Sequence, residues 1–279
     1  MKKISRRSFL AAAGLSVAAL ALTACGGSSA STASSGASSA ASSEAASTSA
    51  AAGELTTVEA GKLTMATNAT FPPYEMTTDA GEFEGIDIET AQAIADKLGL
   101  ELQIDDMDFD AALLSVQQGK ADIVMAGVTV TDERKAVMDF SDSYATGIQS
   151  IIVPEGSDIA SPDDLAGKKI GTQRGTTGYI YCTDDFGEDA VVAYDSGLTA
   201  VQALNNGQVD AVVIDNAPAQ EFVAANPGLK VLDTSYAEED YAIGVAKGSA
   251  LEDAVNKALE ELKADGTLQA IVDKYINAN

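Results

Sequence analysis

An internal repeat constrains the fold of this chain more than any other feature. Residues 111–127 (AALLSVQQGKADIVMAG) and residues 199–215 (TAVQALNNGQVDAVVID) align without a gap. Each copy is typical of a short helix, a glycine at which the helix ends, and a buried strand. Two copies of such a unit predict two lobes of similar βαβ architecture.

Short apolar runs alternate with helical periods outside the repeat, which is typical of an α/β protein with mostly parallel strands. Further strands are expected at 63–66, 100–104 and 241–246. The two C-terminal helices are expected to complete the first lobe, so the chain crosses between lobes near 144–147 and 240–243. Lobe 1 then comprises residues 54–144 and 241–279, and lobe 2 comprises residues 145–240.

Residues 1–24 are typical of a bacterial signal peptide. A basic start is followed by the apolar run Phe9–Leu22, which is shorter than the roughly 20 residues that span a bilayer. Leu22–Cys25 matches the lipobox of bacterial lipoproteins, in which the signal is removed before a cysteine that is then lipidated. Cys25 is therefore expected to anchor the chain to the extracytoplasmic face of the cell membrane. The pair Arg6–Arg7 leaves general secretory and twin-arginine export both open.

The lipidated cysteine and a flexible tether are expected to occupy residues 25–53. Residues 26–53 are almost wholly Ser, Ala, Thr and Gly, with Glu44 as the only charge. Such a composition builds no core. A coil of this length has a root-mean-square span of roughly 30 Å.

Composition excludes several classes of function. A formal net charge of −25 disfavours nucleic acid as a partner. The chain contains no His, which removes Ser-His-Asp and Cys-His catalysis and His-rich metal sites. No cofactor or metal is expected. Cys25 and Cys182 are the only cysteines, and Cys182 is predicted to be a buried, inert thiol.

Two strand ends predicted by the repeat carry candidate binding residues. Gly127 and Asp215 occupy equivalent positions, and ligands of open α/β sheets gather at such ends. A cap at Thr131 or Asp132 places Arg134 in the first turn of a helix, where an anionic partner would relieve its conflict with the helix dipole. The alternative for Arg134 is a solvated side chain that pairs with Asp132 or another neighbour. The alternative for Asp215 is capping of the following helix.

A glycine-rich turn, Gly171–Gly178, lacks the Lys-Ser/Thr ending of a phosphate loop. Its free N–H groups suit a carboxylate at the start of a helix. The alternative is an ordinary turn without a ligand.

Several motifs together resemble the family-3 bacterial extracellular solute-binding proteins, which bind polar amino acids for ABC importers. They occur in the family's order and spacing across residues 55–277: TNATFPPYE (67–75), GIDI (85–88), MDF (107–109), AGVTVTDER (126–134), FS (140–141), GTT (175–177) and the segment from Gly266 to Tyr275. The resemblance implies the two-lobe periplasmic-binding-protein fold of type II with a double-strand hinge. It also implies a monomer that passes a free amino acid to a permease with its ATPase.

The resemblance implies a role for each ligand-binding residue. Arg134 would clasp the α-carboxylate with the N–H groups of Thr129 and Thr177, while the Gly127 carbonyl, the Thr129 hydroxyl and Asp215 would hold the α-ammonium. The ligand side chain would lie between two rings and meet four polar side chains at its far end, namely Phe71, Phe109, Asn68, Gln173, Thr70 and Thr176.

Family members for basic ligands or for glutamine often carry Asp at the position of Asn68, so the resemblance implies a neutral polar amino acid, with a basic one as the second expectation. A sensor for a membrane receptor remains an alternative to the importer. A dehydratase-type enzyme on the same fold is a weaker alternative, since it needs a general acid in the cleft and the expected carboxylate there is assigned to the ammonium. No catalysis is expected.

Overall fold

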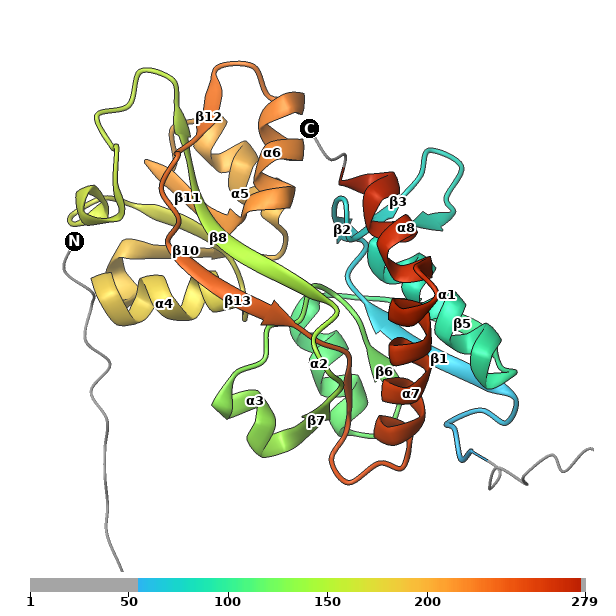
Figure 1. The fold of residues 1–279 in the computed structure, drawn as a ribbon. Coiled ribbons are helices and arrows are strands. Elements are labelled where there is room, and N and C mark those ends of the chain that lie inside the picture. The colour runs from blue at the N-terminus through green and yellow to red at the C-terminus, as the bar shows by residue number, and fades with distance from the viewer. Residues whose placement is uncertain (1–54, 277–279) are drawn as a thin grey trace, which may run out of the picture. The chain divides into compact units, whose positions relative to one another are not determined.

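The computed structural model describes residues 55–276 as two main β-sheets flanked by helices, with a small third sheet beside the first (Figure 1). All the described residues belong to one compact unit, and the two lobes are therefore described together. The expected signal peptide, lipidation site Cys25 and tether lie outside the described residues.

The first sheet has the strand order β5-β1-β6-β14-β7. Strand β1 runs parallel to its neighbours β5 and β6, whereas β14 runs antiparallel to β6 and β7. Its strands are β1 (Lys62–Thr67), β5 (Glu101–Asp106), β6 (Ile123–Val124), β7 (Met138–Phe140) and β14 (Gly244–Ala246). Its helices are α1 (Ile86–Leu98), α2 (Phe109–Gln117), α3 (Asp132–Val137), α7 (Leu251–Ala264) and α8 (Thr267–Tyr275). The small sheet contains β2 (Thr70–Phe71), β3 (Glu75–Thr77) and β4 (Phe83–Glu84).

The second sheet has the order β10-β9-β11-β8-β12, and β13 pairs with β8 off this path. Strands β10, β9 and β11 are parallel, and β8 is antiparallel to its neighbours. Its strands are β8 (Ala145–Pro154), β9 (Ile170–Gln173), β10 (Val191–Tyr194), β11 (Ala211–Asp215), β12 (Leu229–Val231) and β13 (Ala237–Tyr241). Its helical segments are η1 (Pro162–Leu165), α4 (Thr177–Phe186), η2 (Glu188–Ala190), α5 (Gly197–Asn205) and α6 (Asn216–Ala225).

The internal repeat is present in three dimensions as α2–β6 in the first lobe and α5–β11 in the second. In each copy, a carboxylate just before the strand accepts a hydrogen bond from the backbone of the parallel strand beside it in the sheet, or of the residue directly before that strand. Asp122 Oδ2 accepts a 2.8 Å hydrogen bond from Thr64 N, and Asp210 Oδ2 accepts one of the same length from Lys169 N. The two copies therefore share this carboxylate hydrogen bond, buried at Asp122 and exposed at Asp210, as well as a pattern of apolar residues.

Strands β8 and β13 connect the two lobes and lie side by side in the antiparallel register Ala145↔Tyr241 (Figure 1). Both predicted crossings fall at this end of the pair. The single strand expected at 241–246 is wrong, because β13 ends at Tyr241 and β14 begins at Gly244. The chain changes sheets between them, where Ala242 N bonds Val128 O and Ile243 N bonds Ser141 Oγ.

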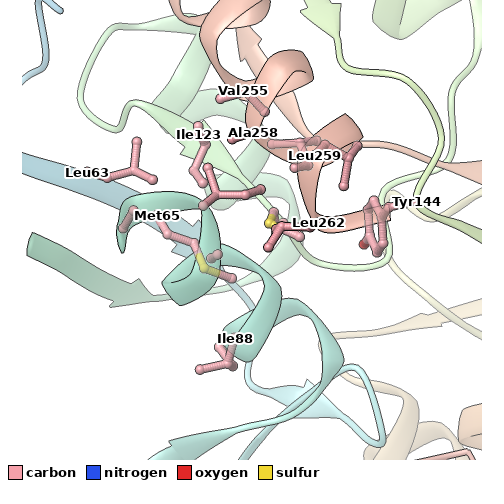
Figure 2. Close-up of a cluster of buried hydrophobic side chains, with 14 of the residues drawn as sticks. Leu63, Met65, Ile88, Ile123, Tyr144, Val255, Ala258, Leu259 and Leu262 are labelled. Carbon is pink, nitrogen blue, oxygen red and sulfur yellow. The ribbon is translucent and has the colours of Figure 1, made fainter. Parts of the chain in front are cut away.

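The core of the first lobe explains why the C-terminal helices return to it. Buried residues of α7 recur at helical spacing and pack against the side chains of β1 and β6 (Figure 2). These α7 residues are Val255, Ala258, Leu259 and Leu262. Burying each large apolar side chain stabilises the fold by about 1.5–3 kcal/mol. No helix within residues 55–276 is both long enough and apolar enough to cross a bilayer.

Candidate functional site

One pocket collects ten of the eleven residues that the sequence predicts to bind a ligand; Thr70 does not line it and instead donates to Asn68. They lie at the ends of strands from both sheets and at the starts of the following helices, as the strand-end rule for α/β sheets leads one to expect. The ten are Asn68, Phe71, Phe109, Gly127, Thr129, Arg134, Gln173, Thr176, Thr177 and Asp215. Their roles toward a ligand remain predictions, but their convergence is a property of the fold.

Arg134 is buried at the start of α3, with only 8% of its surface exposed. The Thr131 side chain caps this helix by accepting a hydrogen bond from Arg134 N, which confirms the predicted cap. The guanidinium lies 5.3 Å from the Phe109 ring centroid and donates to Thr129 O (2.8 Å) and Gly175 O (3.1 Å). These bonds use two of its five N–H donors, which leaves capacity for a bidentate carboxylate.

Burial lowers the pKa of Arg134, and the negative charge of Glu239 opposes that shift. Arg134 makes no ion pair within 4.0 Å among the described residues; its two protein acceptors are neutral carbonyls. A buried cation satisfied only by carbonyls attracts an anion strongly, because water does not screen the interaction there. The solvated Arg134–Asp132 pair considered from sequence is therefore wrong.

The first turn of α4 adds N–H groups next to the guanidinium. Thr176 caps the helix by accepting from Tyr179 N and donating to Gln173 O, and Thr177 is the first helical residue. The first N–H groups of an α-helix have no partner within the helix and favour anions. Thr177 is 3% exposed and lines the same pocket as Arg134, so its N–H suits an anion at this end of the pocket.

Asp215 is the acidic counterpart of Arg134 in the pocket and is 2% exposed. Oδ1 accepts from Ala217 N (3.2 Å), so the predicted alternative of a helix cap for α6 is observed. Oδ2 accepts from Ile148 N (2.7 Å), and the Tyr241 hydroxyl also bonds the carboxylate. Burial nevertheless raises the pKa of Asp215 to about 6, and the negative charge of Glu239 adds to the rise. The cap and a place in the pocket are thus compatible.

Gly127 lies in the wall of the pocket between two aromatic rings. Its φ of 54° is in the left-handed region, and a Cβ there would lie 3.0 Å from Phe71 and 3.2 Å from Tyr241. Its N–H donates to Asp87 Oδ2 (2.9 Å), which holds the peptide in place. Only glycine fits this backbone conformation and this space without strain.

Two amides from opposite lobes meet at the other side of the pocket. Gln173 Nε2 donates to Asn68 Oδ1 (2.9 Å), which also accepts from Thr70 Oγ1 (3.0 Å). Asn68 Nδ2 donates to Met107 O (2.8 Å). Asn68 and Gln173 are both buried, so their remaining hydrogen-bonding capacity points to a polar group in the pocket. The next residue, Arg174, is exposed and pairs with Asp195.

The two lobes touch directly around this pocket. Besides the Arg134–Gly175 and Asn68–Gln173 bonds, the Thr129 and Thr177 hydroxyls lie 3.5 Å apart. Gly175 packs so tightly on the first lobe that a Cβ would lie 1.6 Å from Asp110 Oδ1. The structure therefore shows the lobes closed on each other.

Sequence reasoning missed several side chains of the pocket, among them Glu75, Gln149 and Tyr241. It also missed Glu239, which does not line the pocket but accepts hydrogen bonds from two residues that do, Thr129 and Gln149. Gln149 and Glu239 are buried polar residues on the hinge strands, and polar residues at inward positions of predicted buried strands were the available signal.

Two further predictions concern chemistry outside the pocket. Cys182 is fully buried, as predicted, and burial raises the pKa of its thiol to about 12, so thiolate reactivity is suppressed at neutral pH. Within residues 55–276 no three His, Cys, Asp or Glu side chains are grouped so that they could hold a metal ion.

The pocket can thus bind a small molecule that carries one negative and one positive charge. Arg134 and the start of α4 form an anion site, and Asp215 forms a cation site in the same enclosed space. An α-amino acid carries both charges on adjacent groups.

Comparison with known proteins extends this picture. The family model for bacterial extracellular solute-binding proteins, family 3, matches residues 63–278. The L-cystine-binding protein TcyJ of Escherichia coli (strain K12) is 34% identical over 226 residues, covering 79% of this chain and 85% of the relative. A probable histidine-binding protein of Neisseria gonorrhoeae is 34% identical and covers 95% of this chain and 94% of its own length.

Among solved structures, an ancestral arginine-binding protein bound to glutamine is 44% identical to this chain. It superposes with a TM-score of 0.74 over 77% of this chain and 98% of its own length. The match confirms the predicted fold, a two-lobe periplasmic-binding-protein fold of type II with a double-strand hinge.

Proposed function

We propose that this chain, which belongs to the bacterial extracellular solute-binding proteins, family 3, captures a free polar amino acid outside the cytoplasm and delivers it to an ABC importer. The observation that carries the proposal is the presence of Arg134 and Asp215 in one closed pocket, each buried and each without an oppositely charged protein partner within 4.0 Å among the described residues.

The α-carboxylate is proposed to bind Arg134 through two parallel N–H···O bonds. The N–H groups of Thr129 and Thr177 would complete the anion site. A planar guanidinium matches a planar carboxylate, and the Phe109 ring already holds its orientation. Binding would give the buried cation the anionic partner that its neutral carbonyl acceptors do not supply.

The α-ammonium is proposed to bind the Asp215 carboxylate, the Gly127 carbonyl and the Thr129 hydroxyl. Asp215 already accepts bonds from Ala217 N, Ile148 N and the Tyr241 hydroxyl, and an ionised carboxylate has about four acceptor sites. A fourth donor carrying a positive charge would lower the raised pKa of Asp215 and keep it ionised.

The ligand side chain is proposed to lie between Phe71 and Phe109 and to meet Asn68, Gln173 and Thr176. Two neutral amides favour a neutral polar side chain. A basic amino acid is the second candidate, because the relatives include a probable histidine-binding protein and an ancestral arginine-binding protein.

Binding rather than catalysis is proposed, since Asp215 is assigned to the ammonium and the relatives are named as amino-acid-binding proteins. We further propose a monomer anchored through Cys25, with lobe 1 at 54–144 and 241–279 and lobe 2 at 145–240. The permease and its ATPase would be the partners, and a sensor role toward a membrane receptor is the alternative.

A thermal-shift screen of residues 26–279 against the twenty proteinogenic amino acids and cystine tests the proposal. A ligand at 100 times its Kd stabilises by about 2.7 kcal/mol, which raises the Tm of a domain of this size by roughly 5–10 °C. Calorimetry of the best ligand then gives the stoichiometry. A screen with no shift at millimolar amino acid would refute the proposed function. Uptake measured with and without the cognate permease separates importer from sensor.

A further inference from the structure

Glu239 is a buried carboxylate to which the proposed ligand contacts assign no task. It lies on the hinge strand β13 opposite Gly147 of β8 and is 6% exposed. Its neighbours Glu238 and Asp240 are exposed, so the alternation of the strand turns Glu239 to the same face as Tyr241, a pocket residue. Burying a carboxylate is costly unless donors or cations compensate it.

Both donors to Glu239 come from the walls of the pocket. Oε2 accepts from Thr129 Oγ1 (3.1 Å) and from Gln149 Nε2 (3.0 Å). The other oxygen, Oε1, is buried and has no hydrogen-bond partner among the described residues. Glu239 therefore joins the hinge strand to the loop that carries Thr129, and it brings a second buried negative charge beneath the pocket.

These contacts determine what the Thr129 hydroxyl can offer a ligand. A hydroxyl has one proton and two lone pairs. As a carboxylate, Glu239 can only accept, so the Thr129 proton points to Oε2. In the 3.5 Å contact between the two threonine hydroxyls, Thr177 must then be the donor. Thr129 Oγ1 is therefore left as a hydrogen-bond acceptor at the pocket surface. It can accept from an ammonium group, but it has no proton left to donate to a ligand oxygen such as a carboxylate.

We propose that Glu239 is a positioning residue that holds Thr129 as a hydrogen-bond acceptor and thereby makes the site select for the ligand's α-ammonium. The inference rests on the proposed function, because it takes Thr129 as a ligand of that ammonium. Glu239 itself acts through Thr129 and need not touch the amino acid.

The substitution Glu239→Gln tests this assignment. Its shape is the same, but its amide can turn an N–H toward Thr129 Oγ1 and the negative charge is lost. Calorimetry would compare L-glutamine with glutaramic acid, and L-arginine with 5-guanidinopentanoic acid; each second compound lacks only the α-ammonium and is measured by competition. The affinity for the amino acids should fall roughly 10- to 100-fold, the range for one hydrogen bond to a charged group. The affinity for the des-amino acids should change by less than about threefold.

Two controls separate positioning from a general loss of structure. Glu238→Gln makes the same charge change at the adjacent exposed position and should leave both affinities unchanged. In a Thr129→Val background, Glu239→Gln should have little further effect, since contacting residues that act through one another are not additive. If Glu239→Gln does not fold, Glu239→Asp is measured in its place, and the ratio of amino acid to des-amino acid affinity should still fall.

The possible results distinguish failure of the positioning role of Glu239 from failure of the proposed function. A ratio unchanged from wild type in a folded Glu239 variant, or equal losses for both members of each pair, would overturn the positioning role while leaving the proposed function standing. Failure of the wild-type protein to bind any proteinogenic amino acid or cystine would refute the proposed function and this inference with it.

Discussion

Gln173 donates a 2.9 Å hydrogen bond to Asn68, which joins the last residue of β9 in one lobe to the residue that follows β1 in the other. Both side chains are buried in the pocket wall. The bond requires the two lobes to be in contact, so under the proposed function it would link recognition of the ligand side chain to closure.

Replacing Gln173 should therefore weaken binding more than folding. Gln173→Ala removes one interlobe hydrogen bond, worth about 0.5–1.5 kcal/mol, so calorimetry should show an affinity roughly 2- to 10-fold lower. Arg174→Ala is the matched control, because that side chain is exposed and pairs with Asp195 outside the pocket. Equal effects of the two substitutions would argue against a role for the Asn68–Gln173 bond in binding.

A substitution at Gly175 tests the contact between the closed lobes, because the backbone of this residue packs against the other lobe. Ala at this position would place its Cβ on Asp110, whereas Gly207→Ala changes a glycine of similar positive φ in open space. Both variants should lose comparable thermal stability, but Gly175→Ala should also bind roughly fivefold more weakly, at the low end of overpacking costs because Asp110 can rotate. Unchanged affinity in Gly175→Ala would show that closure does not need this contact.

Binding should weaken in acid because of Asp215. Burial raises its pKa from the ordinary 3.8 to about 6 in the ligand-free protein, and a bound ammonium lowers it again. Ligand therefore prefers the ionised form, and affinity should fall by up to tenfold per pH unit below about pH 6. The ligand keeps both its charges between pH 5 and 7.

The same group makes an opposite contribution to ligand-free stability. Because the folded-state pKa is raised, the folded protein binds the proton more tightly than the unfolded chain, so this contribution to the unfolding free energy declines as pH rises from about 4 to 6. Asp215→Asn should remove the contribution of this carboxylate to the pH dependence of both affinity and unfolding free energy, and it should bind weakly at every pH. Calorimetry at pH 5, 6, 7 and 8 measures the affinity. A wild-type affinity that does not change with pH would contradict the role given to Asp215.

Cys25 should determine where the protein resides. Cys25→Ser removes the predicted lipidation site, so the chain should move from the membrane fraction to the periplasm or medium, since two acyl chains are needed for firm anchoring. Immunoblots of the fractions report the distribution. Cys182→Ser, which changes a buried thiol in α4, should stay with the membrane. Retention of Cys25→Ser at the wild-type level would contradict the anchor.

Local sequence signals were sufficient for the repeated units and for the cap that presents Arg134. The equivalent anchors Asp122 and Asp210 follow from the same pattern. The break between β13 and β14 was missed, because residues 241–246 form one apolar run and the change of sheet depends on partners more than 100 residues away.

The support beneath the pocket was not predictable from local sequence. Glu239 meets Thr129 and Gln149 only because β13 and β8 pair in one register, and these residues are 110 and 90 positions apart in the chain. Alternation along β13 places Glu239 inward, but no local pattern names its partners. The sequence left open whether Asp215 caps a helix or lines the pocket, and in the structure it does both.

Arg134 provides the most direct test of amino acid binding in this pocket. Calorimetry with the best ligand of the screen would compare wild type with Arg134→Ala, Arg134→Lys and the exposed control Lys135→Ala. Losing one partner of a buried charge pair costs roughly 2–5 kcal/mol, so Arg134→Ala should bind about 30- to 4,000-fold more weakly. Arg134→Lys should recover only part of this loss, because a point charge lacks the guanidinium fork, and Lys135→Ala should bind as wild type does. Near-wild-type affinity in a folded Arg134→Ala protein would place the carboxylate elsewhere and contradict the proposed site.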